Sequence, residues 1–135
     1  MMYLLDTNVT SEAKRKNPDA MRWIEKTKAG DHYIGVVSLT EISKGAHRLG
    51  RSDKGRAEDI FKWLKALETQ FRDRMIAVDQ TIAIECGRVA ALRTRGEMHC
   101  LIAAAANVNN MTLVTRNVRD FSDTGVTLVN PRDQD

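Results

Sequence analysis

Short apolar segments alternate with longer amphipathic segments along the chain, and this alternation restricts the fold more than any other feature. The short segments are rich in β-favouring residues, and the strands they predict cover residues 2–5, 33–37, 75–78, 111–115 and 127–129. The intervening segments, such as residues 60–71, place apolar residues at three- and four-residue intervals and predict helices. We therefore expect an α/β fold, a three-layer α/β/α sandwich with a four- to five-stranded, mostly parallel sheet.

Local signals predict where several helices begin. Asn17 and Pro18 together predict the end of one helix and the start of the next. Ser38, followed three residues later by Glu41, has the spacing of a capping box and predicts a helix that begins after Ser38. Asp79 directly follows a predicted strand and is expected to cap the helix that starts at residue 80.

The composition indicates one globular domain over residues 1–135. Hydrophobic residues make up 42% and charged residues 29% of the chain, which argues against disorder. No apolar run approaches the roughly 18–20 residues needed to cross a bilayer, and we expect neither a secretory signal nor a membrane partner. The spacing of Cys86 and Cys100 matches no zinc or redox motif, so we expect free thiols and a cytoplasmic location. The formal net charge of +3 is compatible with a polyanionic partner.

Acidic side chains follow four of the predicted strands. They are Asp6, Glu41, Asp79 and Asp120. In a parallel sheet these positions lie along one edge, where ligands bind, although the sequence does not show that the first, second and fourth strands are neighbours. Carboxylates that gather at one place raise one another's pKa, and a hard divalent cation relieves that repulsion. Such an ion can polarise a phosphodiester and activate a bound water.

Each of these side chains also has a structural explanation. Glu41 can be only the capping-box acid, and Asp120 can cap the turn into Phe121. We interpret Asp79 as a helix cap. Asp6 is the hardest to explain structurally, because an acid at the end of a buried strand needs a partner. Asn8 and Ser11 are either turn and cap residues or side chains that orient the Asp6 carboxylate.

Four motifs resemble those of a known family. Residues 4–9 read Leu-Leu-Asp-Thr-Asn-Val, and residues 38–45 read Ser-Leu-Thr-Glu-Ile-Ser-Lys-Gly. Residues 101–106 read Leu-Ile-Ala-Ala-Ala-Ala, and residues 113–121 read Leu-Val-Thr-Arg-Asn-Val-Arg-Asp-Phe. In this order and spacing the motifs resemble PIN-domain ribonucleases, in particular the VapC-type toxins of bacterial toxin–antitoxin pairs. The resemblance covers essentially the whole chain.

The resemblance implies a metal-dependent endoribonuclease that uses Mg²⁺ or Mn²⁺, forms a homodimer, is neutralised by a cognate antitoxin and meets operator DNA only through that antitoxin. It implies that the catalytic, metal-binding carboxylates are Asp6, Glu41 and Asp120. The side chains that orient the site would be Thr7, Asn8, Thr115 and Asn117. For contacts with the RNA substrate we single out Arg116, Arg119 and Lys44, because phosphates attract basic side chains near the site.

His99 departs from the family pattern, which has an aspartate at this position. Imidazole suits Mn²⁺ and other transition ions better than Mg²⁺. Three interpretations follow. His99 ligates a softer ion, or it marks a site of reduced or lost activity, or it is an ordinary residue at a helix start because the loop before it is short. The second interpretation makes a catalytically silent, antitoxin-binding PIN domain the alternative function. A phospho-accepting receiver domain and an Asp-x-Asp phosphatase fit poorly, because position 8 is Asn and Arg116, not a lysine, follows Thr115.

Overall fold

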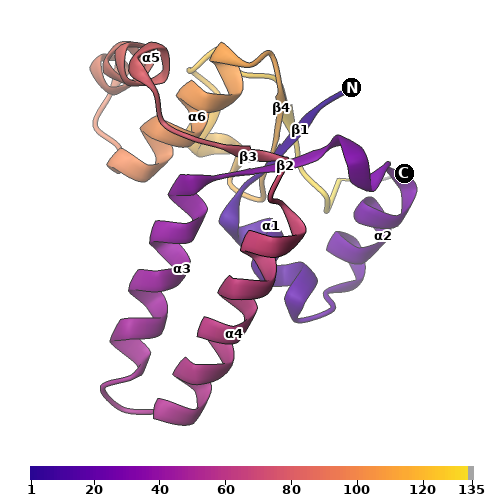
Figure 1. Ribbon diagram of the computed structural model, residues 1–135. Helices are drawn as coiled ribbons and strands as arrows, with labels where there is room; N and C mark the ends of the chain where they lie inside the picture. Colours follow the sequence, from indigo (N-terminus) through magenta and orange to yellow (C-terminus); the bar gives the residue numbers. More distant parts are fainter. Residues whose placement is uncertain (134–135) are drawn as a thin grey trace.

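Five short strands form a parallel sheet at the centre of the protein, as the sequence predicts (Figure 1). The structure is a computed structural model that describes residues 1–133. The strands are β1 (Tyr3–Leu5), β2 (His32–Gly35), β3 (Met75–Ile76), β4 (Thr112–Val114) and β5 (Leu128–Val129). Their order across the sheet is β3-β2-β1-β4-β5, and every pairing is parallel. The first strand therefore lies in the middle, between the second and the fourth.

Six α-helices and two short 3₁₀ turns connect the strands. The elements are α1 (Thr7–Lys14), α2 (Pro18–Lys26), η1 (Ala29–Asp31), α3 (Val36–Leu49), α4 (Lys54–Gln70), α5 (Gln80–Leu92), α6 (Glu97–Val108) and η2 (Val118–Phe121). Helices α3 and α4 pack against each other as a long hairpin that extends away from the sheet, whereas α5 and α6 form a second packed pair (Figure 1). No helix within residues 1–133 combines the length and the apolar character that a membrane span requires.

Alternate residues of the strands belong to two hydrophobic clusters, one on each face of the sheet. Leu4 and Leu113 are fully buried in a cluster to which α5 and α6 also contribute. Leu5 and Val114, one residue further along the same strands, belong to the other cluster, which α1 to α4 cover. Successive side chains of a strand point to opposite faces of the sheet. A strand that contains only apolar residues is therefore buried on both faces. This arrangement is the predicted three-layer sandwich.

The predicted helix start at Pro18 and the predicted cap at Asp79 are confirmed. The Asn17 side chain accepts hydrogen bonds from the backbone N–H groups of Asp19 (3.0 Å) and Ala20 (3.2 Å), and Pro18 is the first residue of α2. The Asp79 side chain accepts a hydrogen bond of 2.9 Å from the Ile82 N–H at the start of α5. Both side chains satisfy helix N–H groups that have no partner within the helix.

The predicted start of the third helix is wrong. Strand β2 ends at Gly35 and α3 begins at Val36, so the predicted strand over residues 33–37 is too long and Ser38 lies inside the helix. Gly35 occupies the N-cap position, where no side chain can cap the helix. Ser38 is fully buried, and neither it nor Glu41 serves as a capping-box residue. Their side chains contact α1 instead, as described below.

A buried histidine joins β2 to α2 through an aromatic cluster. His32 stacks on Trp23 with ring centroids 5.2 Å apart, and its Nε2 lies 2.7 Å from the Thr27 hydroxyl. Burial lowers the pKa of His32, and the charge of Arg74 lowers it further. The neutral imidazole is therefore the form that the folded protein favours.

We expect the free energy of unfolding to fall as the pH drops below about 6.5, the value for an unperturbed histidine. Below that pH the unfolded chain binds a proton at His32 more readily than the folded chain, so acid shifts the equilibrium towards unfolding until the folded-state pKa is passed. Urea unfolding at several pH values checks this: His32→Phe should show a weaker dependence than wild type. In the control variant His47→Phe, which changes an exposed histidine of α3, the dependence should remain. Equal pH dependence in all three proteins would contradict the assignment.

Candidate active site

The order of the strands decides which acidic residues meet. Because β1 lies between β2 and β4, the segments that follow these three strands are neighbours at one edge of the sheet. They contribute Asp6, directly after β1, Glu41 in the second turn of α3, and Thr115, directly after β4. Asp79 follows the edge strand β3, caps α5 and takes no part in this cluster.

Asp6 is a buried carboxylate held by three donors. Its side chain is only 5% exposed. One oxygen accepts a hydrogen bond from the Thr7 N–H (2.7 Å), and the other accepts from the Thr115 hydroxyl (2.8 Å) and the Asn8 amide (3.3 Å). Burial raises the pKa of Asp6 above its usual range, although the hydrogen bonds from Thr115 and Thr7 oppose the rise. The carboxylate is therefore fixed in place but lacks a full counter-charge.

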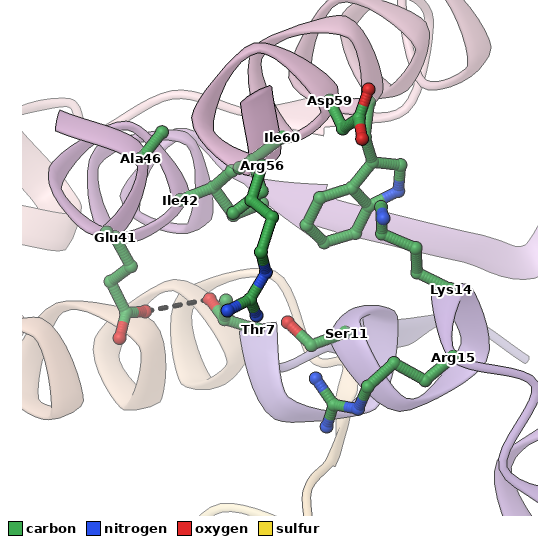
Figure 2. Close-up of a pocket in the computed structure, with 12 residues that line it drawn as sticks. Thr7, Ser11, Lys14, Arg15, Glu41, Ile42, Ala46, Arg56, Asp59 and Ile60 are labelled. Carbon is green, nitrogen blue, oxygen red and sulfur yellow. Dashed lines mark hydrogen bonds between the residues drawn. The ribbon is translucent and has the colours of Figure 1, made fainter. Parts of the chain in front are cut away.

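Thr7 connects this carboxylate to Glu41. While its backbone N–H donates to Asp6, its hydroxyl donates a hydrogen bond of 2.8 Å to Glu41 Oε1 (Figure 2). The Ser38 hydroxyl lies 2.9 Å from the Thr7 hydroxyl, close enough for a further hydrogen bond. Burial raises the pKa of Glu41, and the neighbouring charge of Asp6 raises it further. One residue thus holds two carboxylates whose charges repel each other.

Asn8, Thr115 and Asn117 form a small network that joins the start of α1 to the end of β4. The Asn8 amide N–H₂ donates to the Thr115 hydroxyl (3.2 Å), and its carbonyl accepts from the Arg116 N–H (3.2 Å). The Asn117 N–H donates to the same Thr115 hydroxyl (3.0 Å). Thr115 is fully buried, so these contacts fix the hydroxyl that holds Asp6. Asn117 contributes its backbone here.

Asp120 and His99 lie at the more open side of the cluster. Asp120 belongs to η2 and His99 to the first turn of α6, and their side chains are 48% and 33% exposed. His99 Nδ1 is 3.8 Å from Asp120 Oδ2, and its ring centroid is 5.2 Å from that of Phe121. The charges of both side chains act on the pKa of Asp6: Asp120 raises it and protonated His99 lowers it. Protonated His99 also lowers the pKa of Glu41.

The geometry suits an ion that takes few ligands from the protein. In the part of the chain that the structure describes, no three His, Cys, Asp or Glu side chains come close enough together to enclose a metal ion. Asp6 and Glu41 offer hard oxygen donors, and burial raises the pKa of each. The charge of Asp6 raises the pKa of Glu41 further and the charge of Asp120 raises that of Asp6, so a cation is favourable there. Mg²⁺ is commonly held by one or two carboxylates, with water and phosphate oxygens completing its shell. The donor set fits such an ion.

The three residues singled out for RNA contacts differ in their surroundings. Arg116 donates from Nη1 to Oε1 of Glu12 (2.5 Å), a carboxylate that is almost fully buried. Arg119 is exposed and lines a hollow of about 310 Å³ together with Arg116, Asn117 and Asp120. Lys44 is exposed on α3 and lines a different hollow, but its charge lowers the pKa of Glu41.

The loop between α5 and α6 holds the turn that carries Asp120, a role that the sequence did not reveal. Arg95 donates to the Asp120 carbonyl (2.7 Å) and forms a bidentate pair with Asp123 (2.9 and 2.6 Å). Arg93 donates to the Arg119 carbonyl (2.8 Å). Two arginines before a glycine indicate only a helix end in the sequence, because their acceptors are two backbone carbonyls and the Asp123 carboxylate, 25 to 28 residues away. These contacts can be seen only in the tertiary structure.

A cavity of about 380 Å³ adjoins Glu41 and Thr7 on the side of α4 (Figure 2). Helix α1 contributes Thr7 and Ser11 to its lining, and α3 contributes Glu41. On the α4 side it is lined by Arg56 and Trp63. Arg56 was not singled out from the sequence.

Comparisons with known proteins agree with this geometry. The profile of the PIN domain matches residues 3–126. The plasmid stability protein StbB of Pseudomonas syringae pv. tomato is 29% identical over 140 residues, covering 96% of this chain and 98% of the relative. Toxin FitB of Neisseria gonorrhoeae is 27% identical over 96% of this chain and 98% of its own. The VapC ribonuclease Y4jK of Sinorhizobium fredii is 25% identical over 96% and 97%.

The fold also matches that of solved structures. A structure of FitAB bound to a DNA fragment superposes with a TM-score of 0.86 at 22% identity, covering 99% of this chain and 98% of the matched chain. At that identity the likeness concerns the fold alone. The sequence match extends over almost the entire described chain and includes every segment that builds the carboxylate cluster. The chain belongs to the PIN-domain family.

Proposed function

We propose that this protein is a metal-dependent endoribonuclease that acts as a toxin and is neutralised by a cognate antitoxin. The observation that carries the proposal is the bridge made by Thr7, which holds Asp6 through its N–H and Glu41 through its hydroxyl. A buried and a half-buried carboxylate, both fixed and both with a raised pKa, at the carboxyl ends of a parallel sheet are suited to bind a cation, not to stabilise the fold.

In this proposal Asp6 and Glu41 hold Mg²⁺ or Mn²⁺, while Asp120 and His99 are further candidate ligands. Bound there, a divalent ion would supply polarisation of the phosphodiester and activation of a water. Thr115 and Asn8 fix the orientation of the Asp6 carboxylate, because both donate to its Oδ2 atom. Asp120 is exposed enough to reach substrate or solvent from η2, and Asn117 supports Thr115 through its N–H.

The proposed partners follow from the relatives. The relatives include a toxin and a VapC ribonuclease, and one similar structure is of FitAB bound to DNA. By this analogy we propose an RNA substrate, a cognate antitoxin, a homodimer, and contact with operator DNA only through the antitoxin.

A second candidate is a catalytically silent PIN domain that binds an antitoxin. Two observations favour it: His99 stands where the family pattern has an acid, and no three ligating side chains of the described residues enclose a common site. Imidazole in place of a carboxylate removes a hard oxygen donor and a negative charge.

Incubation of purified protein with labelled single-stranded RNA distinguishes the two candidates. We expect cleavage with Mg²⁺ or Mn²⁺ and none when EDTA removes the ion. RNA that stays intact with either ion, in a protein that circular dichroism shows to be folded, would contradict the nuclease and support the silent domain.

A further inference from the structure

Two arginines in the cavity beside Glu41 lack a carboxylate partner. Arg56, in the first turn of α4, and Arg15, at the carboxyl end of α1, both line the cavity. Among the residues that the structure describes, neither guanidinium has an ion-pair or hydrogen-bond partner. Guanidinium groups are strong donors whose planar fork matches a phosphate, so an unpaired one in a cavity is available to a ligand.

The direction of these side chains connects them to the carboxylate cluster. Figure 2 shows Arg56 extending from α4 across the cavity, towards Thr7 and Ser11 on α1. Arg15 extends from the opposite end of α1. Thr7 and Glu41, which belong to the carboxylate cluster, line the same cavity. A strand of RNA bound at Glu41 therefore has a continuous path to both arginines.

The charges that line the cavity favour an anion. Its cationic side chains are Lys14, Arg15 and Arg56, and its acidic ones are Glu41 and Asp59. Glu41 is the carboxylate that the proposed function assigns to a cation, which leaves three positive charges against one negative. The Lys14 ammonium lies 5.6 Å from the centre of the Trp63 ring, so part of this charge is held over the apolar wall of the cavity.

We propose that Arg56 and Arg15 form a phosphate subsite that holds the RNA backbone next to the phosphodiester that is cut. The subsite rests on the proposed function, because it takes the substrate of that site to be RNA. Arg56 acts as a substrate-binding residue and touches a phosphate other than the one near Asp6 and Glu41. Phosphate contacts of this kind set the affinity and its salt dependence without selecting bases.

Fluorescence anisotropy with a labelled single-stranded RNA tests the subsite in the full chain. The measurements use the Asp6→Asn variant in EDTA, so that RNA is neither cut nor held through an ion. In this background we expect Arg56→Gln and Arg15→Gln each to weaken binding about three- to tenfold. Each should also reduce the slope of log K against log salt by about 0.7, the value for one phosphate contact on a single strand. Arg56→Lys should retain most of the slope, since it keeps the charge.

Arg72→Gln is the matched control, because it removes an exposed arginine beyond the other end of α4. Equal losses of RNA affinity in Arg72→Gln and Arg56→Gln would show that only the net charge matters and would overturn the subsite. An unchanged RNA affinity and an unchanged salt slope in Arg56→Gln would also overturn the subsite. The cavity would then be a binding site for a protein partner instead. Cleavage by the wild-type protein is scored separately. RNA that binds through Arg56 but is never cut would contradict the nuclease proposal and retain the subsite.

Discussion

Asp6→Asn is expected to abolish RNA cleavage while leaving the protein folded. Asparagine keeps the shape of the side chain, and its one oxygen can still accept from the Thr7 N–H, but an NH₂ group replaces the oxygen that accepts from Thr115 and Asn8, and the negative charge is lost. An ion held by Asp6 and Glu41 then loses one of the two negative charges that the protein supplies. A loss of several kcal/mol in transition-state stabilisation corresponds to a rate lower by about a hundredfold or more.

The same substitution should not reduce stability in the absence of metal. Burial raises the pKa of Asp6, which means that the charged form is disfavoured in the folded protein. A neutral amide removes that penalty, which offsets the hydrogen bonds lost from Thr115 and Asn8, so the melting temperature in EDTA is expected to stay close to that of the wild type. A lower melting temperature together with lost cleavage would instead assign Asp6 a structural role.

Asp79→Asn provides the control for this experiment. Asp79 also follows a strand, and its side chain accepts from the Ile82 N–H (2.9 Å). Asparagine caps helices about as well as aspartate, so neither stability nor cleavage should change appreciably. Equal losses of activity in the two variants would show that cleavage responds to any lost acid at the end of a strand and would contradict the assignment of Asp6.

His99→Asp is expected to raise the affinity for Mg²⁺, by about ten- to hundredfold. It replaces imidazole by a hard oxygen donor at a position whose charge already acts on both Asp6 and Glu41. Calorimetric titration with Mg²⁺ and Mn²⁺ measures the change directly. The preference of the wild-type protein should lie with Mn²⁺, because imidazole suits transition ions, and the variant should shift it towards Mg²⁺.

His47→Asp is the matched control, since His47 is an exposed histidine on α3 that contacts Phe61 and not the carboxylates. If His99→Asp and wild type bind both ions and cut RNA equally, His99 lies outside the metal site. A gain of metal binding without a gain of cleavage would favour the silent domain. A similar gain in His47→Asp would mean that added negative charge, and not position 99, attracts the ion.

The sequence predicted the three layers of the fold but not which strands are neighbours within the sheet. Apolar residues in consecutive positions of β1 and β4 required burial on both faces, which is a local property of each strand. Whether Asp6 and Glu41 meet depends on β1 lying between β2 and β4, which no local pattern encodes. The family resemblance supplied that information where the physical pattern could not.

Ser38 and Glu41 show how a local rule can fail at a site. Their spacing is that of a capping box, yet α3 begins two residues before Ser38 and both side chains contact Thr7. The polar residues that a cap requires are the same ones that a site requires, so the sequence cannot separate the two roles. The position of Arg56 and the structural role of Arg95 were not predicted for another reason: the residues they face or hold lie about 15 to 49 positions away in the chain.

The position of β4 in the sheet determines when the carboxylate cluster becomes complete during synthesis. Asp6 leaves the ribosome 109 residues before Thr115, whose hydroxyl holds it, and β4 pairs with β1 only after residues 112–114 have emerged. Chains generally fold from the amino terminus as they are made. A nascent chain therefore carries Asp6 and Glu41 without this support until Thr115 has emerged. The cell that makes this protein meets the finished cluster only after that point.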